Sequence, residues 1–211
     1  MLPALTDLVL PRRCAGCGRP GELLCVSCRP SGPPLRLAGF DAVVLAAGRY
    51  EHRLRSAVLA YKERGRHELA RPLAQLLAVA ALLSLRGPGA PVVLVPVPSA
   101  RAAARRRGGD HVLRLARVAG ARWRIPVEPA LRLVRAVHDS AGLGAAARHA
   151  NLAGAMAAAR PPPSVPAALL VDDIVTTGAT LHEATRALRA AGWPVLGAVA
   201  LAATPLRRRM N

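Results

Sequence analysis

The segment that most constrains the fold is an alternation of strand, helix and strand near the end of the chain. Residues 167–171 are an apolar run typical of a buried strand, and residues 172–180 are expected to form a loop. Apolar side chains then recur at helical spacing from about 180 to 191, and Gly192 follows as a C-cap. Residues 195–201 predict the next strand. Such a βαβ unit requires a parallel sheet with a right-handed crossover, so the sequence predicts an α/β domain with a parallel-sheet core flanked by helices.

A second local feature is a group of four cysteines near the start of the chain. Cys14, Cys17, Cys25 and Cys28 form two Cys-x-x-Cys pairs separated by a short spacer. Two such knuckles can present four thiolates to one tetrahedral Zn²⁺ at about 2.3 Å each, and a closed set of four ligands makes the metal structural. Two disulfides or a redox pair are the alternatives, and an intracellular chain disfavours disulfides. The spacing predicts a small zinc ribbon.

Composition and periodicity divide the chain around these two features. The expected divisions are a zinc ribbon at 1–31, a linker at 32–40, the main domain at 41–205 and a basic tail at 206–211. The main domain is also expected to contain strands at 42–46 and 92–95 and helices near 54–61, at 69–85 and at 111–119.

The balance of charge indicates an anionic partner. The 30 basic residues outnumber the 12 acidic ones and give a formal net charge of +18. A field of this sign attracts nucleic acid, an acidic membrane surface or phosphorylated metabolites. Five aromatic residues offer few platforms for stacking single-stranded bases. No targeting segment is recognisable, and the longest apolar run, 73–85, is shorter than the ~20 residues of a membrane span. We expect a cytoplasmic protein without membrane insertion.

The expected loop at 172–180 carries residues suited to a sugar phosphate. Ligands of parallel sheets bind at the carboxyl ends of strands, where this loop lies. The Thr-Thr-Gly-Ala-Thr run at 176–180 leads into a helix, whose free N–H groups favour an anion. Gly178 allows the backbone to approach a phosphate closely. Asp172 and Asp173 can accept hydrogen bonds from the two hydroxyls of a ribose. The sequence therefore predicts a site for a phosphorylated pentose.

This string resembles the phosphoribosyl-diphosphate (PRPP) loop of type I phosphoribosyltransferases. Together with the cysteines, the chain from about residue 10 to 203 is similar to the ComF family, which joins a zinc ribbon to a phosphoribosyltransferase-like domain. Further motifs match that family, namely Tyr50, Tyr61-Lys62, the 64–66 stretch, Pro96-Val97-Pro98, Arg107-Gly108, Arg148 and Asn151. Two segments depart from it. Gly109-Asp110-His111 stands where Phe-Asn-Gln is usual, and Ser140 stands where Gln is usual.

The resemblance implies a type I phosphoribosyltransferase fold and a chain that binds PRPP with Mg²⁺. Asp172 and Asp173 are the implied catalytic residues. The implied PRPP-binding residues are Val171, Asp172, Asp173, Thr176, Thr177, Gly178, Ala179, Thr180, Pro98, Ser99, Arg101, Arg107 and Lys62. Residues 98–101 and Arg107 would face the leaving pyrophosphate. Residues 135–148, outside that set, would form a closing flap.

Three functions are compatible with this resemblance. The first is transfer of a phosphoribosyl group to a nitrogen acceptor with release of pyrophosphate. The second, implied by the family's name, is a non-catalytic accessory role in single-stranded DNA uptake during natural transformation. The third is a module that senses PRPP or a nucleotide. A homo-oligomer is compatible with each of them.

Overall fold

Five strands form the central sheet of this computed structural model, which describes residues 12–84, 91–99, 104–105, 108–137, 144–162, 164 and 166–204. The sheet order is β1-β2-β7-β6-β3. The strands are β1 (Leu35–Leu37), β2 (Val43–Arg49), β3 (Val92–Pro96), β6 (Ala167–Val175) and β7 (Val195–Ala203). Only β1 at one edge is antiparallel to its neighbour, and the other pairs run parallel. A mostly parallel sheet confirms the predicted class, an α/β domain.

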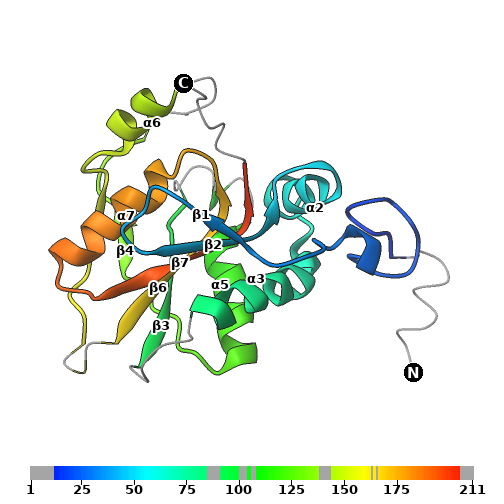
Figure 1. Ribbon diagram of the computed structural model, residues 1–211, viewed down its shortest axis with the longest axis horizontal. Helices are drawn as coiled ribbons and strands as arrows, with labels where there is room; N and C mark the ends of the chain where they lie inside the picture. The colour runs from blue at the N-terminus through cyan, green and yellow to red at the C-terminus, as the bar shows by residue number, and fades with distance from the viewer. Residues whose placement is uncertain are drawn as a thin grey trace.

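Helices cover both faces of this sheet (Figure 1). On one face lie α2 (His52–Glu63), α3 (Ala70–Ser84) and α5 (His111–Trp123), with the short helix η2 (His67–Leu69) between the first two. The other face carries α7 (Ala179–Ala190) and the small antiparallel pair β4 (Leu131–Leu133) and β5 (Met156–Ala158). Each face of the sheet is therefore buried, which explains why β6 and β7 read as almost continuous apolar runs.

The crossover from β6 through α7 to β7 follows the prediction closely. Gly192, at φ 94°, donates its N–H to the carbonyl of Arg189, and the N–H of Trp193 donates to the carbonyl of Leu188. These two bonds satisfy carbonyls at the end of α7 and turn the chain toward β7. The predicted end of the helix was right because a glycine in the left-handed region marks it in the sequence.

The predicted loop at 172–180 was wrong in extent. Strand β6 continues to Val175 and α7 already begins at Ala179, so only three residues connect them. Aspartate is rare in strands, which is why the sequence pattern ended the strand before Asp172. The strand continues because Asp172 pairs with Ala200 of β7 and Ile174 with Ala202.

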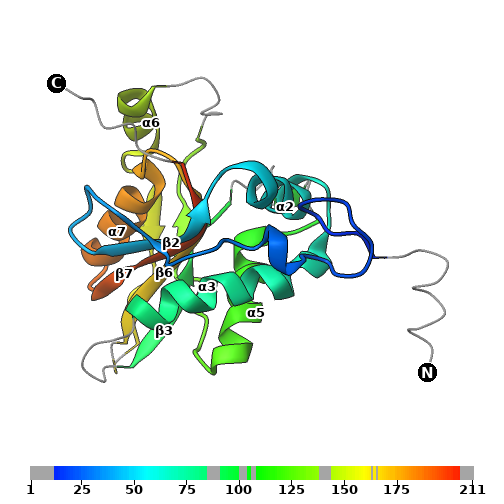
Figure 2. The same cartoon turned by 45° about the vertical axis from the view of Figure 1, so that its right-hand side comes forward.

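The cysteine segment packs beside α2, on the face of the sheet that carries α2, α3 and α5. It lies at the right of Figure 1 and is seen again in the turned view of Figure 2. Leu24 is 1% exposed, and it belongs to the same apolar cluster as Leu54 and Val58 of α2. Arg53 of α2 donates to the carbonyl of Ser27 in the short helix η1 (Val26–Cys28). The segment thus packs against the core of the main domain, because it is too small to form a core of its own.

The segment between the two parts, expected as a linker at 32–40, includes β1 and ends at Phe40, which lies against the loop after β6. Among the described helices, none is long and apolar enough to cross a membrane.

Candidate functional site

Two adjacent carboxylates are buried near the carboxyl end of β6. Asp172 is 6% exposed and Asp173 is 5% exposed. The N–H of Asp173 donates to Oδ1 of Asp172 at 2.8 Å, and the N–H of Ile174 donates to Oδ1 of Asp173 at 2.7 Å. One oxygen of each acid is thereby engaged by the backbone of the next residue, which fixes both side chains at this edge of the sheet.

The second oxygen of Asp173 contacts two side chains from α2 and α5. Lys62 near the end of α2 places Nζ 2.8 Å from Oδ2, and His111 at the start of α5 places Nε2 2.6 Å from the same atom. An ionised carboxylate only accepts hydrogen bonds, so Nε2 of His111 carries a proton and donates a hydrogen bond to Asp173. The buried acid is therefore paired with a cation and an imidazole.

The surroundings of the two acids shift their pKa values in opposite directions. Burial raises the pKa of Asp172 well above its usual value, and the neighbouring charge of Asp173 raises it further. Burial also opposes ionisation of Asp173, but the hydrogen bond from His111 and the charge of Lys62 outweigh burial and lower its pKa. The pair thus combines one acid that favours its neutral form with one that favours its charged form.

His111 also connects Asp173 to the loop that follows β3. Ser99 places Oγ 3.4 Å from Nδ1 of His111, and the backbone N–H of Ser99 donates to Oδ2 of Asp110 at 2.8 Å. Asp110 is the N-cap of α5 and accepts from the N–H groups of Val112 and Leu113. The segment that departs from the ComF pattern therefore joins two strand ends at the same edge of the sheet.

The turn after β6 leads directly into α7. Thr176 is exposed, Thr177 is half-buried and Gly178 is the N-cap at φ 79°, which an L side chain adopts only under strain. Thr177 Oγ1 accepts from the N–H of Ala179 at 3.4 Å, and Thr180 lies half-buried in the first turn of α7. The helix start, with hydroxyls beside it, forms the kind of site that favours an anion.

The ring of Phe40 packs against Gly178 in the turn before α7. A Cβ built on Gly178 would lie 2.5 Å from Cζ of Phe40, closer than any real contact of this kind. The Phe40 ring stacks on the imidazole of His182 in α7, with centroids 4.6 Å apart. Glycine is therefore required here by two independent constraints, the positive φ and the ring of Phe40.

Helix α6 (Ala145–Leu152) stands above the sheet at the end where β6 gives way to α7 (Figure 1). Arg148 of α6 donates from Nη1 to Oγ1 of Thr176 at 3.4 Å. The ring of His149 lies 5.4 Å from that of His182. This places a cation from the expected flap region beside the turn.

The remaining predicted PRPP-binding residues divide into three groups. Pro98 and Ser99 directly follow β3 and are half-buried at the same sheet edge. Val171 is fully buried in the strand, and its carbonyl accepts from the N–H of Val97. Arg101 and Arg107 lie outside the described residues, as do Ser140 and the basic tail at 206–211.

The four cysteines come together as a compact cluster. Their sulfur atoms all lie within 4.8 Å of one another, with 3.6 Å between Cys14 and Cys25 and 3.7 Å between Cys17 and Cys25. Four ligands at about 2.3 Å from a tetrahedral metal lie about 3.8 Å apart, which agrees with these separations. All four are free thiols rather than disulfides, which need about 2.05 Å.

The backbone around this cluster favours the thiolate of Cys14, whereas burial and the neighbouring cysteines raise the pKa of Cys28. Burial would raise the pKa of Cys14, but hydrogen bonds from backbone N–H groups, including that of Cys25, lower it to about 6. A Cβ at Gly16 would lie 2.8 Å from Sγ of Cys28, so a side chain there would displace a ligand. The cluster can hold a metal ion such as zinc.

Sequence reasoning did not find the contacts of Lys62 and His111 with Asp173, or the role of Phe40. Lys62 is the chain's only lysine, which is a signal, but no periodicity links it to a residue 111 positions further on. The aspartate before the first apolar turn of α5 was a detectable N-cap signal for Asp110.

No protein-family model matches the chain, and no curated protein matches it. Among solved structures it is similar to one titled "Structure of Leishmania donovani UMP synthase", with 19% sequence identity and a TM-score of 0.39. The match covers 72% of this chain and 25% of that chain, so this chain spans about a quarter of that protein's length.

Proposed function

We propose that the carboxyl edge of this sheet binds PRPP, or a related 5-phosphoribosyl compound, as in a ComF-like phosphoribosyltransferase. The carrying observation is the short distance along the chain between Asp172-Asp173 and the turn at 176–178 that starts α7. Two acids beside an anion site are unfavourable for phosphate alone. They suit a molecule with ribose hydroxyls at one end and a phosphate at the other.

The opposite pKa shifts of the acids support this assignment. A carboxyl group whose neutral form is favoured by burial can donate a hydrogen bond, while a neighbour whose charged form is favoured accepts one. Asp172 and Asp173 would thus offer both kinds of partner to the ribose hydroxyls. Lys62, which pairs with Asp173, would turn toward the phosphates when a ribose hydroxyl takes its place at the carboxylate.

Mg²⁺ would be carried mainly by the ligand. Among the described residues, only the cysteine cluster brings three or more metal-ligating side chains together. Both oxygens of Asp173 already accept hydrogen bonds, so the acids do not form a ready cation cage. Mg²⁺ keeps several waters and binds phosphate oxygens readily, which fits a site where it arrives with the diphosphate.

In the proposed transfer, an acceptor nitrogen bonds to C1 of the ribose while the bond from C1 to the diphosphate oxygen breaks. The nitrogen loses a proton, and pyrophosphate departs with the bonding electron pair. The transition state gains positive charge on the ribose, so a fixed negative charge at Asp173 would stabilise it. Positioning by Thr176, Thr177 and the start of α7 would supply the rest.

Calorimetric titration of the Asp172→Asn/Asp173→Asn variant with PRPP and Mg²⁺ tests the assignment. We expect binding to be lost, whereas Asp41→Asn, which alters an acid whose side chain is 88% exposed, should bind as the parent does. Because the double variant also removes the partner of Lys62, Thr177→Val provides a variant with the acids intact, and it should weaken binding as well. Undiminished PRPP affinity in the double variant would refute the assignment.

For the cysteine cluster we propose a structural Zn²⁺. Four thiolates leave no open coordination position, and the cluster lies beside α2 rather than at the carboxyl edge. Elemental analysis of protein purified without added metal should find one zinc per chain. A folded, metal-free preparation would contradict this proposal.

A further inference from the structure

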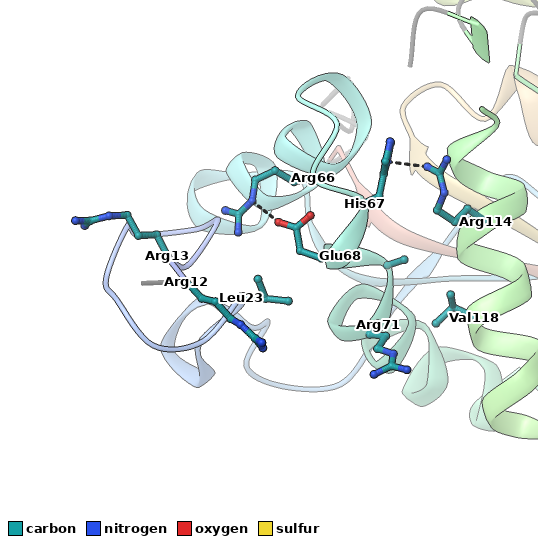
Figure 3. A pocket seen from close by; sticks show the side chains of 10 residues that line it. Arg12, Arg13, Leu23, Arg66, His67, Glu68, Arg71, Arg114 and Val118 are labelled. Atoms are coloured by element: carbon teal, nitrogen blue, oxygen red, sulfur yellow. Dashed lines mark hydrogen bonds and ion pairs between the residues drawn. The ribbon is translucent and has the colours of Figure 1, made fainter. Parts of the chain in front are cut away.

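A basic cavity lies between the cysteine segment and the helices α3 and α5 (Figure 3). Its volume is about 1120 Å³, and none of its lining residues belongs to the acidic pair or to the turn before α7. Five arginines line it, namely Arg12, Arg13, Arg66, Arg71 and Arg114. One carboxylate, Glu68, faces them, so the cavity carries a strong local excess of positive charge.

Three of these arginines, Arg66, Arg71 and Arg114, differ in how much of their charge is neutralised by neighbours. Arg66 pairs with Glu68 at 2.8 Å, and this pair uses the one carboxylate of the lining. Arg114 donates to Nδ1 of His67, an interaction between a cation and a neutral ring that does not reduce the charge (Figure 3). Arg71 makes no hydrogen bond or ion pair with any residue that the structure describes, and it is exposed at the rim.

Part of the cavity lining is apolar. It consists of Leu23 from the cysteine segment, Ala70 at the start of α3 and Val118 on α5. A site that attracted anions by charge alone would not need apolar side chains, whereas ligand pockets combine apolar walls with a few charged groups. Cavities between two parts of a chain are also preferred positions for ligands. No Phe, Tyr, Trp or amide side chain is among the described lining residues, so the organic part of a ligand would contact aliphatic side chains and not an aromatic ring.

We propose that this cavity binds a phosphorylated small organic anion, with its phosphates on the arginines of the lining and its organic part against Leu23, Ala70 and Val118. Arginine suits this task because its planar fork of donors matches phosphate oxygens. The proposal does not require the function proposed for the carboxyl edge, because the two sites share no residue.

One contact connects the cavity to the carboxyl edge. Arg114 donates from Nη2 to the carbonyl of Gly108 at 2.8 Å. It thereby holds the turn that precedes Asp110 and His111, which contact Ser99 and Asp173. An anion that draws Arg114 into the cavity would loosen this turn, so occupancy of one site would change affinity at the other.

Titration of the full chain with ATP and with inorganic tripolyphosphate, without Mg²⁺ and at fixed moderate salt, tests the proposal. Tripolyphosphate carries more charge but has no organic part. We expect ATP to bind more tightly, because only ATP has an organic part that can contact Leu23, Ala70 and Val118. Arg71→Glu should weaken ATP binding by about tenfold or more through reversal of a close charge. Val118→Glu should do so as well.

Two controls distinguish binding in this cavity from attraction by the net charge of the chain. Arg160→Glu makes the same change of charge at an exposed arginine outside the cavity and should leave ATP binding nearly unchanged. The Asp172→Asn/Asp173→Asn variant should also retain ATP binding, so failure of the PRPP site does not affect this test. Equal weakening by Arg160→Glu and Arg71→Glu, or tighter binding of tripolyphosphate than of ATP, would overturn the proposal and indicate attraction by net charge alone.

Discussion

Replacement of Gly178 by alanine tests the described geometry of the turn before α7. At φ 79° an alanine adopts the left-handed region at a cost of about 1–2 kcal/mol. Its Cβ would also lie 2.5 Å from Cζ of Phe40, so the ring must leave its stack on His182. Displacing a packed ring costs about 1–3 kcal/mol. We therefore expect Gly178→Ala to lower the free energy of unfolding by about 3 kcal/mol.

A double-mutant cycle separates the two contributions. In a Phe40→Ala background only the backbone strain remains, so Gly178→Ala should cost about 1 kcal/mol there, which leaves a coupling of about 2 kcal/mol. Gly154 has φ 68° and nothing within 4 Å of a built Cβ, so Gly154→Ala is a matched control for strain without a clash. Urea unfolding measured on the four proteins of the cycle gives each value. Equal costs of Gly178→Ala in both backgrounds would refute the contact with Phe40.

Three further predictions concern the acids and the cysteines. Asp172→Asn should stabilise the fold, and the gain should grow as the pH rises. Burial raises the pKa of Asp172 in the folded state, so its contribution to stability is present at low pH and is lost as the pH passes the folded-state pKa. Urea unfolding at pH 5 and pH 8 checks this. Lys62→Met should destabilise the fold by about 3 kcal/mol, because it leaves the buried charge of Asp173 with His111 alone, and Lys62→Arg should cost less in the same thermal and urea assays. Removal of metal with a strong chelator, or Cys28→Ser, should expose Leu24 and release the cysteine segment, which limited proteolysis would detect, whereas unchanged protease resistance would contradict the metal's role.

The parts of the fold that the sequence predicted are those that local patterns determine. The run of apolar residues in β6 and β7, the helical spacing in α7 and the glycine at 192 each report their own conformation. The cysteine cluster was predictable for the same reason, because metal ligands at short spacing constrain one another without the rest of the chain.

The surroundings of Asp173 could not be predicted in this way. Its partners Lys62 and His111 come from two other helices and meet only when the sheet is assembled. Asp110 and His111 read as a loss of the ComF pattern, although they supply the N-cap of α5 and the hydrogen bond to the acid. Phe40 lay in an expected linker, and its contact with Gly178 depends on tertiary packing.

The central claim is that this sheet edge holds a ribose and its phosphates together. Titration of the parent chain with PRPP, ribose 5-phosphate and pyrophosphate, each with Mg²⁺, tests it most directly. If the two acids and the start of α7 act on one ligand, PRPP should bind at least about tenfold more tightly than either fragment. Binding of one part of PRPP places the other part at its own site, so the second part binds at a smaller entropic cost. Equal affinity for PRPP and pyrophosphate, or no binding of PRPP, would contradict the account.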